Sequence, residues 1–193
     1  MKNKNPIAMF QAKLGKAERK KIPLANAFSL ATVSPSGKPS SRMMLLKGAD
    51  SRGFIFYTNL KSRKGKEISE NQFASLCFWW PVLGEQVRVE GKVKCVNNQE
   101  ADRYFATRSR GSQIGAWASK QSTVLKSRGE LRVRVKIFEK KFKGMKVPRP
   151  PFWSGFIVVP SRIEFWRGMP DRLHVRTLYV RSGSKWKVKS LYP

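Results

Sequence analysis

The chain has 193 residues, of which 40% are hydrophobic and 11% aromatic, a composition that suits one folded domain and argues against disorder. A single histidine and two widely separated cysteines argue against a histidine-built metal centre and against a disulfide framework. The formal net charge of +28 favours anionic partners, whether phosphorylated metabolites, nucleic acid or acidic lipid surfaces. No apolar run is long enough for a membrane span and the first residues lack a signal-peptide pattern, so we expect a cytoplasmic protein with no membrane partner.

The basic excess is spread along the chain, with 18 of the 40 basic and 7 of the 12 acidic residues in the first hundred positions. Such a spread fits a compositional bias of the host as well as it fits a specific anionic ligand. No recognised nucleic-acid motif is present, although Trp79, Trp80 and Trp117 offer rings for base stacking. We therefore expect nucleic acid, if bound at all, to bind only by non-specific electrostatic attraction.

The first half of the chain reads as one helix followed by strands. Apolar residues at near-helical spacing predict a first helix over residues 6–20. Two β-rich runs flank Pro35-Ser36-Gly37-Lys38 and predict a hairpin. A helix is predicted at 62–72, although Gly65 weakens that reading. The predicted strands are 27–34, 40–47, 53–59, 73–80 and 85–96.

The second half begins with predicted helices at 99–108, 112–120 and 127–143, and a proline cluster at 147–151 then breaks the chain. Strands are predicted at 155–160, 162–166, 174–181 and 186–191. Short strands with interspersed helices, and no βαβ alternation, GxGxxG or P-loop, predict a mainly β, antiparallel barrel with helical insertions. We expect a single domain over 1–193, with an N-terminal helical segment at 1–22 and a helical insertion at 99–146.

Two polar stretches in the first half are candidates for binding anions. Arg42 and Lys47 are five residues apart, so a regular strand would point them to opposite faces, and ordinary exposed cations are the alternative reading. Ser62, Arg63 and Lys64 follow a strand at a predicted helix start, where backbone N–H groups, a hydroxyl and two cations suit a phosphate. A solvated basic turn is the alternative there.

Two further stretches lie in the second half. Tyr104 and Arg108 are four apart on a predicted helix and so share a face, and with Ser112 they form a second candidate phosphate cradle. Arg172, His174 and Arg176 alternate, which on a strand would place all three on one face, where an anion would relieve their repulsion. A lone histidine is otherwise often structural.

Five patterns, RxxLLK, FYTNxxSRK, QVRVEG, SQIGAWxSxQS and EFWx(5)RLHxR, occur in order between about Asn5 and the final residues Leu-Tyr-Pro. Together they resemble the pyridoxamine 5′-phosphate oxidase family. The resemblance implies an FMN-binding split β-barrel that forms a homodimer with FMN at the interface. The implied FMN-binding residues are Arg42, Met43, Met44, Leu45, Leu46, Lys47, Tyr57, Thr58, Arg63, Lys64, Gln86, Gln121, Ser122, Trp166 and Arg176.

The resemblance also implies a substrate site. The substrate phosphate would lie among Lys47, Tyr104, Arg108 and Ser112, while Arg172 and His174 would lie over the pyridine ring as the catalytic residues. The implied reaction, in vitamin B6 metabolism, is oxidation of pyridoxamine or pyridoxine 5′-phosphate to pyridoxal 5′-phosphate, with O2 as electron acceptor and H2O2 as product.

Two positions depart from the family pattern. Val175 follows the histidine where the family has an acidic or amide residue, and Arg167 follows the tryptophan where it has Gln, His or Gly. An acidic neighbour can orient flanking arginines, so we expect its absence at position 175 to affect the turnover rate. Two alternatives therefore stay open: a relative that oxidises another ring, and a non-catalytic protein that binds FMN or pyridoxal phosphate.

Overall fold

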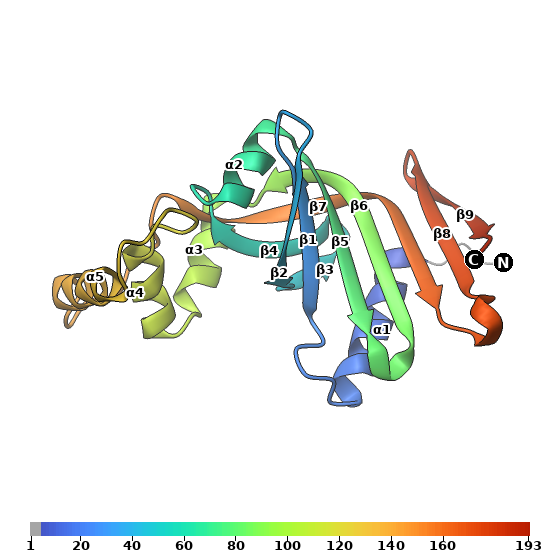
Figure 1. The fold of residues 1–193 in the computed structure, drawn as a ribbon, viewed down its shortest axis with the longest axis horizontal. Helices are drawn as coiled ribbons and strands as arrows, with labels where there is room; N and C mark the ends of the chain where they lie inside the picture. The colour runs from blue at the N-terminus through green and yellow to red at the C-terminus, as the bar shows by residue number, and fades with distance from the viewer. Residues whose placement is uncertain (1–4) are drawn as a thin grey trace.

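The computed structural model describes residues 5–193, which form a nine-stranded sheet curled into a half-barrel with five helices (Figure 1). Every strand ladder is antiparallel, and the sheet order is β2-β1-β5-β6-β7-β4-β3, with β8 added to β7 and β9 to β8. The strands are β1 (Ala27–Val33), β2 (Pro39–Leu45), β3 (Gly48–Asp50), β4 (Gly53–Asn59), β5 (Phe73–Trp80), β6 (Glu85–Cys95), β7 (Trp153–Arg167), β8 (Val175–Ser182) and β9 (Lys185–Leu191). The predicted antiparallel, mainly β architecture is confirmed.

The helices are α1 (Pro6–Arg19), α2 (Arg63–Glu70), α3 (Asn98–Ala106), α4 (Arg110–Ala118) and α5 (Arg128–Lys141). Two short 3-10 helices, η1 (Pro81–Leu83) and η2 (Pro170–Arg172), join strands. No helix among residues 5–193 is both long and apolar enough to cross a membrane.

Strand β7 corrects the sequence prediction of two strands at 155–160 and 162–166, because it continues through Pro160. The register shifts at Glu90/Gly91, so that Gly91 faces Pro160 and Glu90 faces Arg162. This irregularity absorbs Ser161, and the close approach requires a glycine, since a Cβ on Gly91 would lie 2.1 Å from the Val159 carbonyl oxygen. The bulge lets β7 pair with β4 through its first half and with β8 through its second.

The main core lies between α1 and one face of the sheet. Asn5 caps α1 by accepting a hydrogen bond from the Ile7 amide at 2.9 Å. Phe10 on this helix is fully buried, with its ring centroid 4.8 Å from that of Phe54 and 4.7 Å from that of Phe78. Burying each such side chain contributes about 1.5–3 kcal/mol, and this energy holds α1 against the sheet. The helix thereby closes the concave side of the half-barrel.

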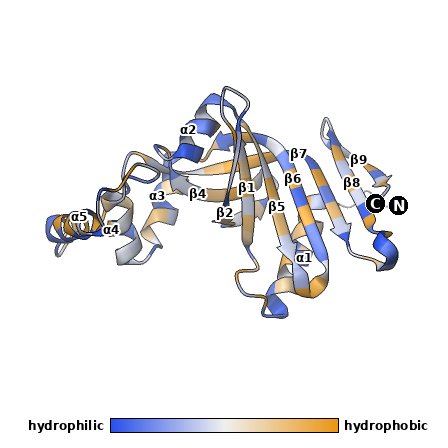
Figure 2. Cartoon of the chain, in the orientation of Figure 1, coloured by the Kyte–Doolittle hydropathy of each residue, from blue (hydrophilic) through white to orange (hydrophobic). Residues whose placement is uncertain are grey.

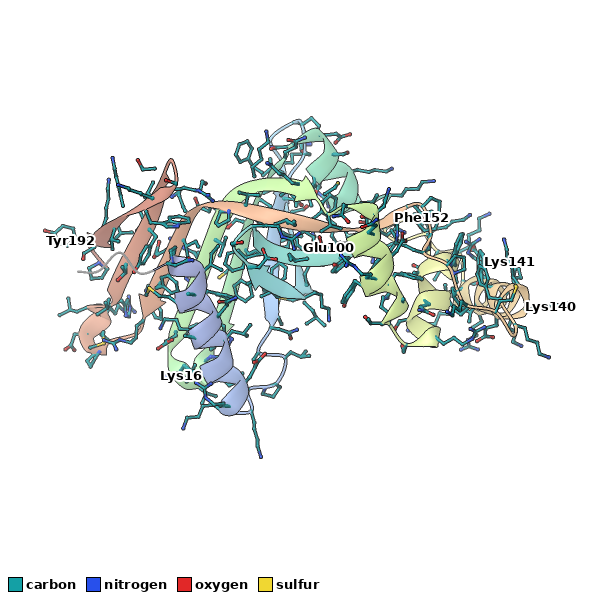
Figure 3. All side chains as sticks on the ribbon, turned by 180° about the vertical axis from the view of Figure 1, so that it is seen from behind. Lys16, Glu100, Lys140, Lys141, Phe152 and Tyr192 are labelled. Carbon is teal, nitrogen blue, oxygen red and sulfur yellow. The ribbon has the colours of Figure 1, made fainter. Side chains whose placement is uncertain are left out.

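Helices α3, α4 and α5 form a separate cluster at one end of the molecule, opposite β8 and β9 (Figure 1). In the view from behind, Lys140 and Lys141 of α5 lie at one end and Tyr192 at the other (Figure 3). Helix α5 carries both hydrophilic and hydrophobic residues (Figure 2), and its Val133 and Ile137 are exposed. A second, smaller core under these helices consists of Phe105, Ile114, Phe142, Val147 and Trp153.

Gly65 lies inside α2, as predicted, although glycine disfavours helices. A Cβ on this residue would lie 2.3 Å from the Leu60 carbonyl oxygen. The glycine therefore lets the first turn of α2 pack directly against the end of β4. Strand β3 has only three residues and was not predicted.

Candidate active site

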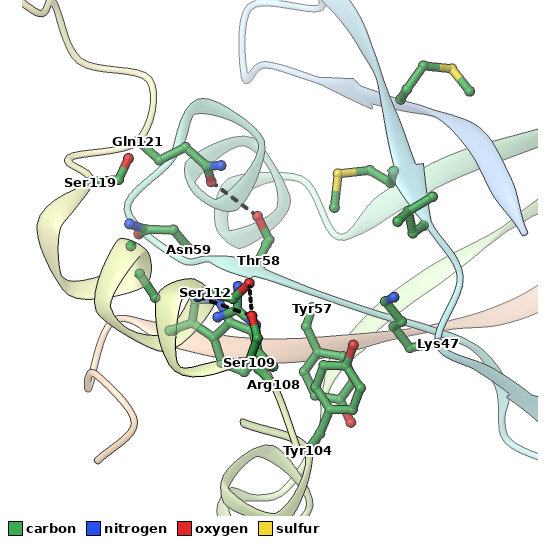
Figure 4. Close-up of a pocket in the computed structure, with 16 residues that line it drawn as sticks. Lys47, Tyr57, Thr58, Asn59, Tyr104, Arg108, Ser109, Ser112, Ser119 and Gln121 are labelled. Carbon is green, nitrogen blue, oxygen red and sulfur yellow. Dashed lines mark hydrogen bonds between the residues drawn. The ribbon is translucent and has the colours of Figure 1, made fainter. Parts of the chain in front are cut away.

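A cavity of about 670 Å³ opens between the end of β2, strand β4 and helices α3 and α4 (Figure 4). It brings together residues that lie far apart in the sequence and has both cationic and aromatic walls. The lining residues predicted from the sequence are Met43, Met44, Leu45, Lys47, Tyr57, Thr58, Tyr104, Arg108, Ser112 and Gln121. Asn59, Ser109, Gly115, Ala116, Ser119 and Trp153 complete the wall.

Three nearly parallel aromatic rings form one wall of this cavity. The Tyr57 ring stacks on Tyr104 with centroids 3.9 Å apart and on Trp153 with centroids 5.4 Å apart. Burial raises the pKa of Tyr57 to about 12, with a smaller contribution from Glu100, so its phenol stays protonated. The wall is thus a stacked apolar surface edged by the neutral Tyr57 hydroxyl.

Arg108 lies beside this wall, with its guanidinium carbon 4.8 Å from the Trp153 ring centroid. Its Nη1 is buried and has no hydrogen-bond partner among residues 5–193, and burial lowers its pKa. The predicted shared helical face with Tyr104 is wrong, because α3 ends at Ala106 and Arg108 lies in the connection to α4. Both side chains nevertheless line the cavity together with Ser112 of α4.

The start of α2 forms the second cationic part of the cavity region. Ser62 caps the helix by accepting a hydrogen bond from the Gly65 amide at 3.3 Å. The buried Lys64 ammonium donates to Thr58 Oγ1 at 3.3 Å and to Gln121 Oε1 at 3.4 Å. Its pKa is lowered, first by burial and then by the nearby Arg42 charge. Among the described residues no carboxylate forms an ion pair with Lys64.

Glu67 lies behind this helix start and binds two arginines. It accepts hydrogen bonds from Arg63 Nε at 2.8 Å and from Arg42 Nη2 at 3.4 Å. Burial would raise its pKa, but hydrogen bonds from Thr32, Ser40 and Arg63 outweigh that effect and hold the pKa at about 2. Arg42 therefore points to the base of the α2 region and is absent from the cavity wall, unlike Lys47.

A second group of predicted residues forms a row across four neighbouring strands. Gln86 faces Trp79 on β5 and Trp166 on β7, and Trp166 in turn faces Arg176 on β8. Directly opposed residues of antiparallel strands point to the same side. This row of four side chains, called here the Trp166 row, is aromatic at two positions and able to hydrogen bond at the others.

The predicted single strand face for Arg172, His174 and Arg176 is wrong, because β8 begins only at Val175. Arg172 ends η2 with a φ of 59°, and His174 lies between η2 and β8. The His174 ring packs against Trp166 with centroids 4.6 Å apart, and its Nδ1 accepts a hydrogen bond from the Met169 amide at 3.2 Å. The imidazole therefore lies against Trp166, inside the Trp166 row.

The single chain keeps the two groups apart. The cavity wall contains none of Gln86, Trp166, Arg172, His174 and Arg176 among its described residues. Five other predicted residues lie outside its lining. Arg42, Arg63 and Lys64 belong to the α2 region, Leu46 is packed in the main core, and Ser122 has a φ of 70° in the loop beyond Gln121. The described residues thus form two separate groups, with most of the cationic groups at the cavity and the α2 start, and the Trp166 row elsewhere.

Sequence reasoning missed three residues that shape these two groups. Glu67 is four residues after Arg63, a spacing that signals a helical ion pair. Trp153 carried no local signal, and Glu164 carried none beyond its place in the EFWx(5)RLHxR pattern, because their partners lie on other elements. Residues 5–193 contain no cluster of His, Cys, Asp or Glu side chains arranged to hold a metal ion.

The curled antiparallel sheet and the cationic cavity beside α2 define a protein of the split β-barrel class. Solved structures agree. PhzG from Burkholderia lata 383, in complex with tetrahydrophenazine-1-carboxylic acid, superposes with a TM-score of 0.93 at 34% identity, covering 98% of this chain and 93% of that one. A pyridoxamine 5′-phosphate oxidase-related, FMN-binding protein from Nostoc punctiforme PCC 73102 shares the fold with a TM-score of 0.78 at 18% identity, covering 98% and 99%.

Sequence comparison narrows the class. The family described as pyridoxamine 5′-phosphate oxidase matches residues 14–141, and the pyridoxine 5′-phosphate oxidase C-terminal dimerisation region matches residues 153–193. The pyridoxine/pyridoxamine 5′-phosphate oxidase of Myxococcus xanthus strain DK1622 is 51% identical over 98% of this chain and 92% of its own. That of Burkholderia mallei strain SAVP1 is 50% identical over 99% and 90%. The chain belongs to the pyridoxamine 5′-phosphate oxidase family.

Proposed function

We propose that this protein uses FMN to oxidise pyridoxine or pyridoxamine 5′-phosphate to pyridoxal 5′-phosphate, with O2 as acceptor and H2O2 as product. The observation that carries the proposal is the cavity that Lys47, Arg108 and Ser112 line together with the Tyr57–Tyr104 stack. Cations and a hydroxyl suit a phosphate monoester, and stacked rings suit a planar heterocycle. The names of the relatives at about 50% identity support the same substrate.

The α2 half-site fits the phosphate of FMN. Lys64 is a buried ammonium whose hydrogen bonds go to neutral oxygens, so an anion there would relieve its burial cost. The Arg63 guanidinium, held at Nε by Glu67, keeps its terminal nitrogens for the same anion. When bound, FMN supplies the acceptor for the two electrons that leave the substrate, and the protein binds, orients and excludes water.

The substrate phosphate is assigned to the other end of the cavity. The unpartnered Nη1 of Arg108 supplies a buried donor, and Lys47 and Ser112 add a second cation and a hydroxyl. A phosphate at this position leaves the pyridine ring beside the stacked wall. The substrate is thereby fixed at both its charged and its planar parts.

The Trp166 row and its neighbours complete the site only if they come from a second copy. The match to a dimerisation region spans residues 153–193, which include Trp166, Arg172, His174 and Arg176. We infer a homodimer in which each active site joins the cavity of one copy to the Trp166 row of the other. Arg172 would then stabilise negative charge at the 3-oxygen of the substrate, and His174, whose Nδ1 accepts from Met169, would present Nε2–H.

The test is steady-state turnover. Purified protein supplied with FMN, O2 and pyridoxine 5′-phosphate is expected to produce H2O2 and pyridoxal 5′-phosphate in equal amounts. Protein that binds FMN and produces neither would be a non-catalytic binder, and the proposal would be wrong. We infer that the protein is located in the cytoplasm.

The shared site has its own test by subunit mixing. Arg108→Met disables the cavity half-site, and Arg176→Met disables the Trp166 half-site. If each site needs both copies, refolding the two inactive variants together restores about one quarter of wild-type activity, since half of the dimers carry one intact site. A mixture that stays inactive, although mixed dimers form, would place both half-sites within one copy.

A second candidate rests on the similarity to PhzG, whose complex holds a carboxylated tricyclic ring. A relative of that kind would turn over such a ring faster than the vitamin B6 phosphates. Comparing kcat/KM for pyridoxine 5′-phosphate and for tetrahydrophenazine-1-carboxylic acid separates the two. The phosphate-directed groups at Lys47, Arg108 and Ser112 favour the former.

A further inference from the structure

Glu164 is a buried carboxylate that holds two arginines from two neighbouring strands. Its side chain on β7 is 5% exposed. Oε1 accepts a hydrogen bond from Arg176 Nε at 2.8 Å, and Oε2 accepts from Arg176 Nη2 at 3.2 Å and from Arg88 Nη2. Burial would raise the pKa of Glu164, but the hydrogen bonds from Arg176 and Arg88 outweigh it and lower the pKa, so the carboxylate stays ionised.

This pairing determines how Arg176 is presented. Arg176 uses its Nε–H and one Nη2–H to donate to the Glu164 carboxylate. Its Nη1 donates to the Tyr192 carbonyl oxygen at 3.1 Å. A guanidinium has five N–H donors, so one N–H on each terminal nitrogen remains for a ligand. Those two donors are directed away from Glu164. The carboxylate thus fixes the orientation of a guanidinium that lies in the Trp166 row.

Arg88 completes the triad on the other side. It lies two residues from Gln86 on the same face of β6, and its Cα partner across the ladder is Glu164. Its Nε is buried without a hydrogen-bond partner among residues 5–193. Without the carboxylate, Arg88 and Arg176 would repel each other across β7, and Arg176 would lose both of its side-chain contacts.

We propose that Glu164 is a positioning residue for the cofactor site: it acts through Arg176, whose free N–H donors it directs toward FMN bound by the opposite copy. This inference rests on the proposed function. It assigns a role to a residue outside the cavity and outside the set of expected ligands. The competing explanation is that Glu164 only neutralises Arg88 and so stabilises the sheet.

A pair of double-mutant cycles separates these explanations. The dissociation constant for FMN is measured by quenching of flavin fluorescence for Glu164→Gln, Arg176→Met, Arg88→Met and the two double variants that contain Glu164→Gln. Coupling appears when the effect of one substitution depends on the presence of the other. The visible spectrum of the bound flavin is recorded for each variant, because a purely structural role would leave it unchanged.

Positioning through Arg176 predicts three results. Glu164→Gln weakens FMN binding at least tenfold, the substitution has less than a twofold further effect in the Arg176→Met background, and both single variants change the flavin spectrum in the same way. Arg88→Met keeps the wild-type spectrum. An effect of Glu164→Gln that persists in the Arg176→Met background and disappears in the Arg88→Met background would overturn the inference.

Failure of the inference is distinguishable from failure of the proposed function. Wild-type protein that does not bind FMN contradicts the function, whereas wild-type protein that binds FMN with uncoupled variants contradicts only the role of Glu164. If Glu164→Gln alone does not fold, the comparison of Arg88→Met with Arg88→Met/Glu164→Gln replaces it, because removing both charges leaves no unpaired buried arginine beside β6. A tenfold loss between those two variants supports the inference, and equal affinities overturn it.

Discussion

Gly155 lies directly opposite Tyr57 in the β4–β7 ladder, and the Tyr57 ring occupies the space that a side chain at residue 155 would need. A Cβ there would lie 2.6 Å from Cε1 of Tyr57. The glycine therefore allows the Tyr57 ring to lie flat across β7, where it stacks on Tyr104 and lies parallel to Trp153. One residue without a side chain thus positions the apolar wall of the active site.

The first prediction concerns this contact. Gly155→Ala is expected to displace the Tyr57 ring, to destabilise the fold by about 1–3 kcal/mol and to raise KM for pyridoxine 5′-phosphate more than it lowers kcat. Thermal unfolding and steady-state kinetics measure both effects. The control is Gly111→Ala on α4, where a Cβ meets no atom within 4 Å. Equal behaviour of the two variants would contradict the proposed role of Gly155.

The second prediction concerns the charge of Lys64. Its pKa in the folded protein is lowered, so the ammonium that would bind the FMN phosphate is lost as the pH rises through a value below the usual 10.4 or so. FMN affinity should therefore fall in the alkaline range, while riboflavin, which lacks the phosphate, should show no such fall. Titration of flavin fluorescence at a series of pH values measures this.

Substitution at the same position gives the matching comparison. Lys64→Met is expected to weaken FMN binding by about 10- to 100-fold, the loss of one charge-assisted hydrogen bond to phosphate. It should leave riboflavin binding unchanged. Lys66→Met, an exposed lysine on the same helix, is the control and should retain wild-type affinity. A loss shared equally by FMN and riboflavin would mean that Lys64 does not bind the phosphate.

The third prediction concerns acid stability. The folded-state pKa of Glu67 is about 2, below its unfolded value, so its stabilising contribution is present above about pH 4.3 and is lost as the pH falls toward 2. Glu67→Gln should make unfolding less dependent on pH in that window. Urea unfolding at several acidic pH values measures the slope. An unchanged slope would show that folding does not lower the pKa of Glu67.

The fourth prediction concerns the two departures from the family pattern, which the structure brings together. Arg167 on β7 and Val175 on β8 are Cα partners. Val175→Asp would place a carboxylate opposite Arg167, and such a pair contributes about 0.2–1 kcal/mol. We expect Val175→Asp to raise the thermal unfolding temperature of the wild-type protein. In the Arg167→Gln background the same substitution should not raise it. A gain of the same size in both backgrounds would show that the two side chains do not interact.

The sequence was sufficient to predict most elements and many residues of the cavity wall. Short β-rich runs predicted the extents of β4 and β5, alternation predicted β6, and helical spacing predicted α1. Strand β7 was predicted as two strands because Pro160 normally ends a strand, whereas a bulge opposite Gly91 accommodates it here. Period-two spacing also failed at Arg172 and His174, because left-handed backbone at Asp171 and Arg172 delays the start of β8.

The sequence was insufficient where partners come from distant strands. Glu164 receives Arg88 and Arg176 only through the β6–β7–β8 ladders, and Tyr57 meets Gly155 only through β4–β7. The separation of the cavity from the Trp166 row has the same cause. The sequence does not show which of the predicted ligands lie close together in one chain. The fold shows that Lys64 and Arg176 belong to different groups.

The most direct test of the account is an anaerobic half-reaction. Purified protein is loaded with FMN, its visible spectrum is recorded, and pyridoxine 5′-phosphate is added in the absence of oxygen. We expect the flavin absorption to bleach, one pyridoxal 5′-phosphate to form per flavin, and the colour to return when oxygen is admitted. A flavin-loaded protein that keeps its full absorption after the substrate is added would contradict the proposed oxidase activity.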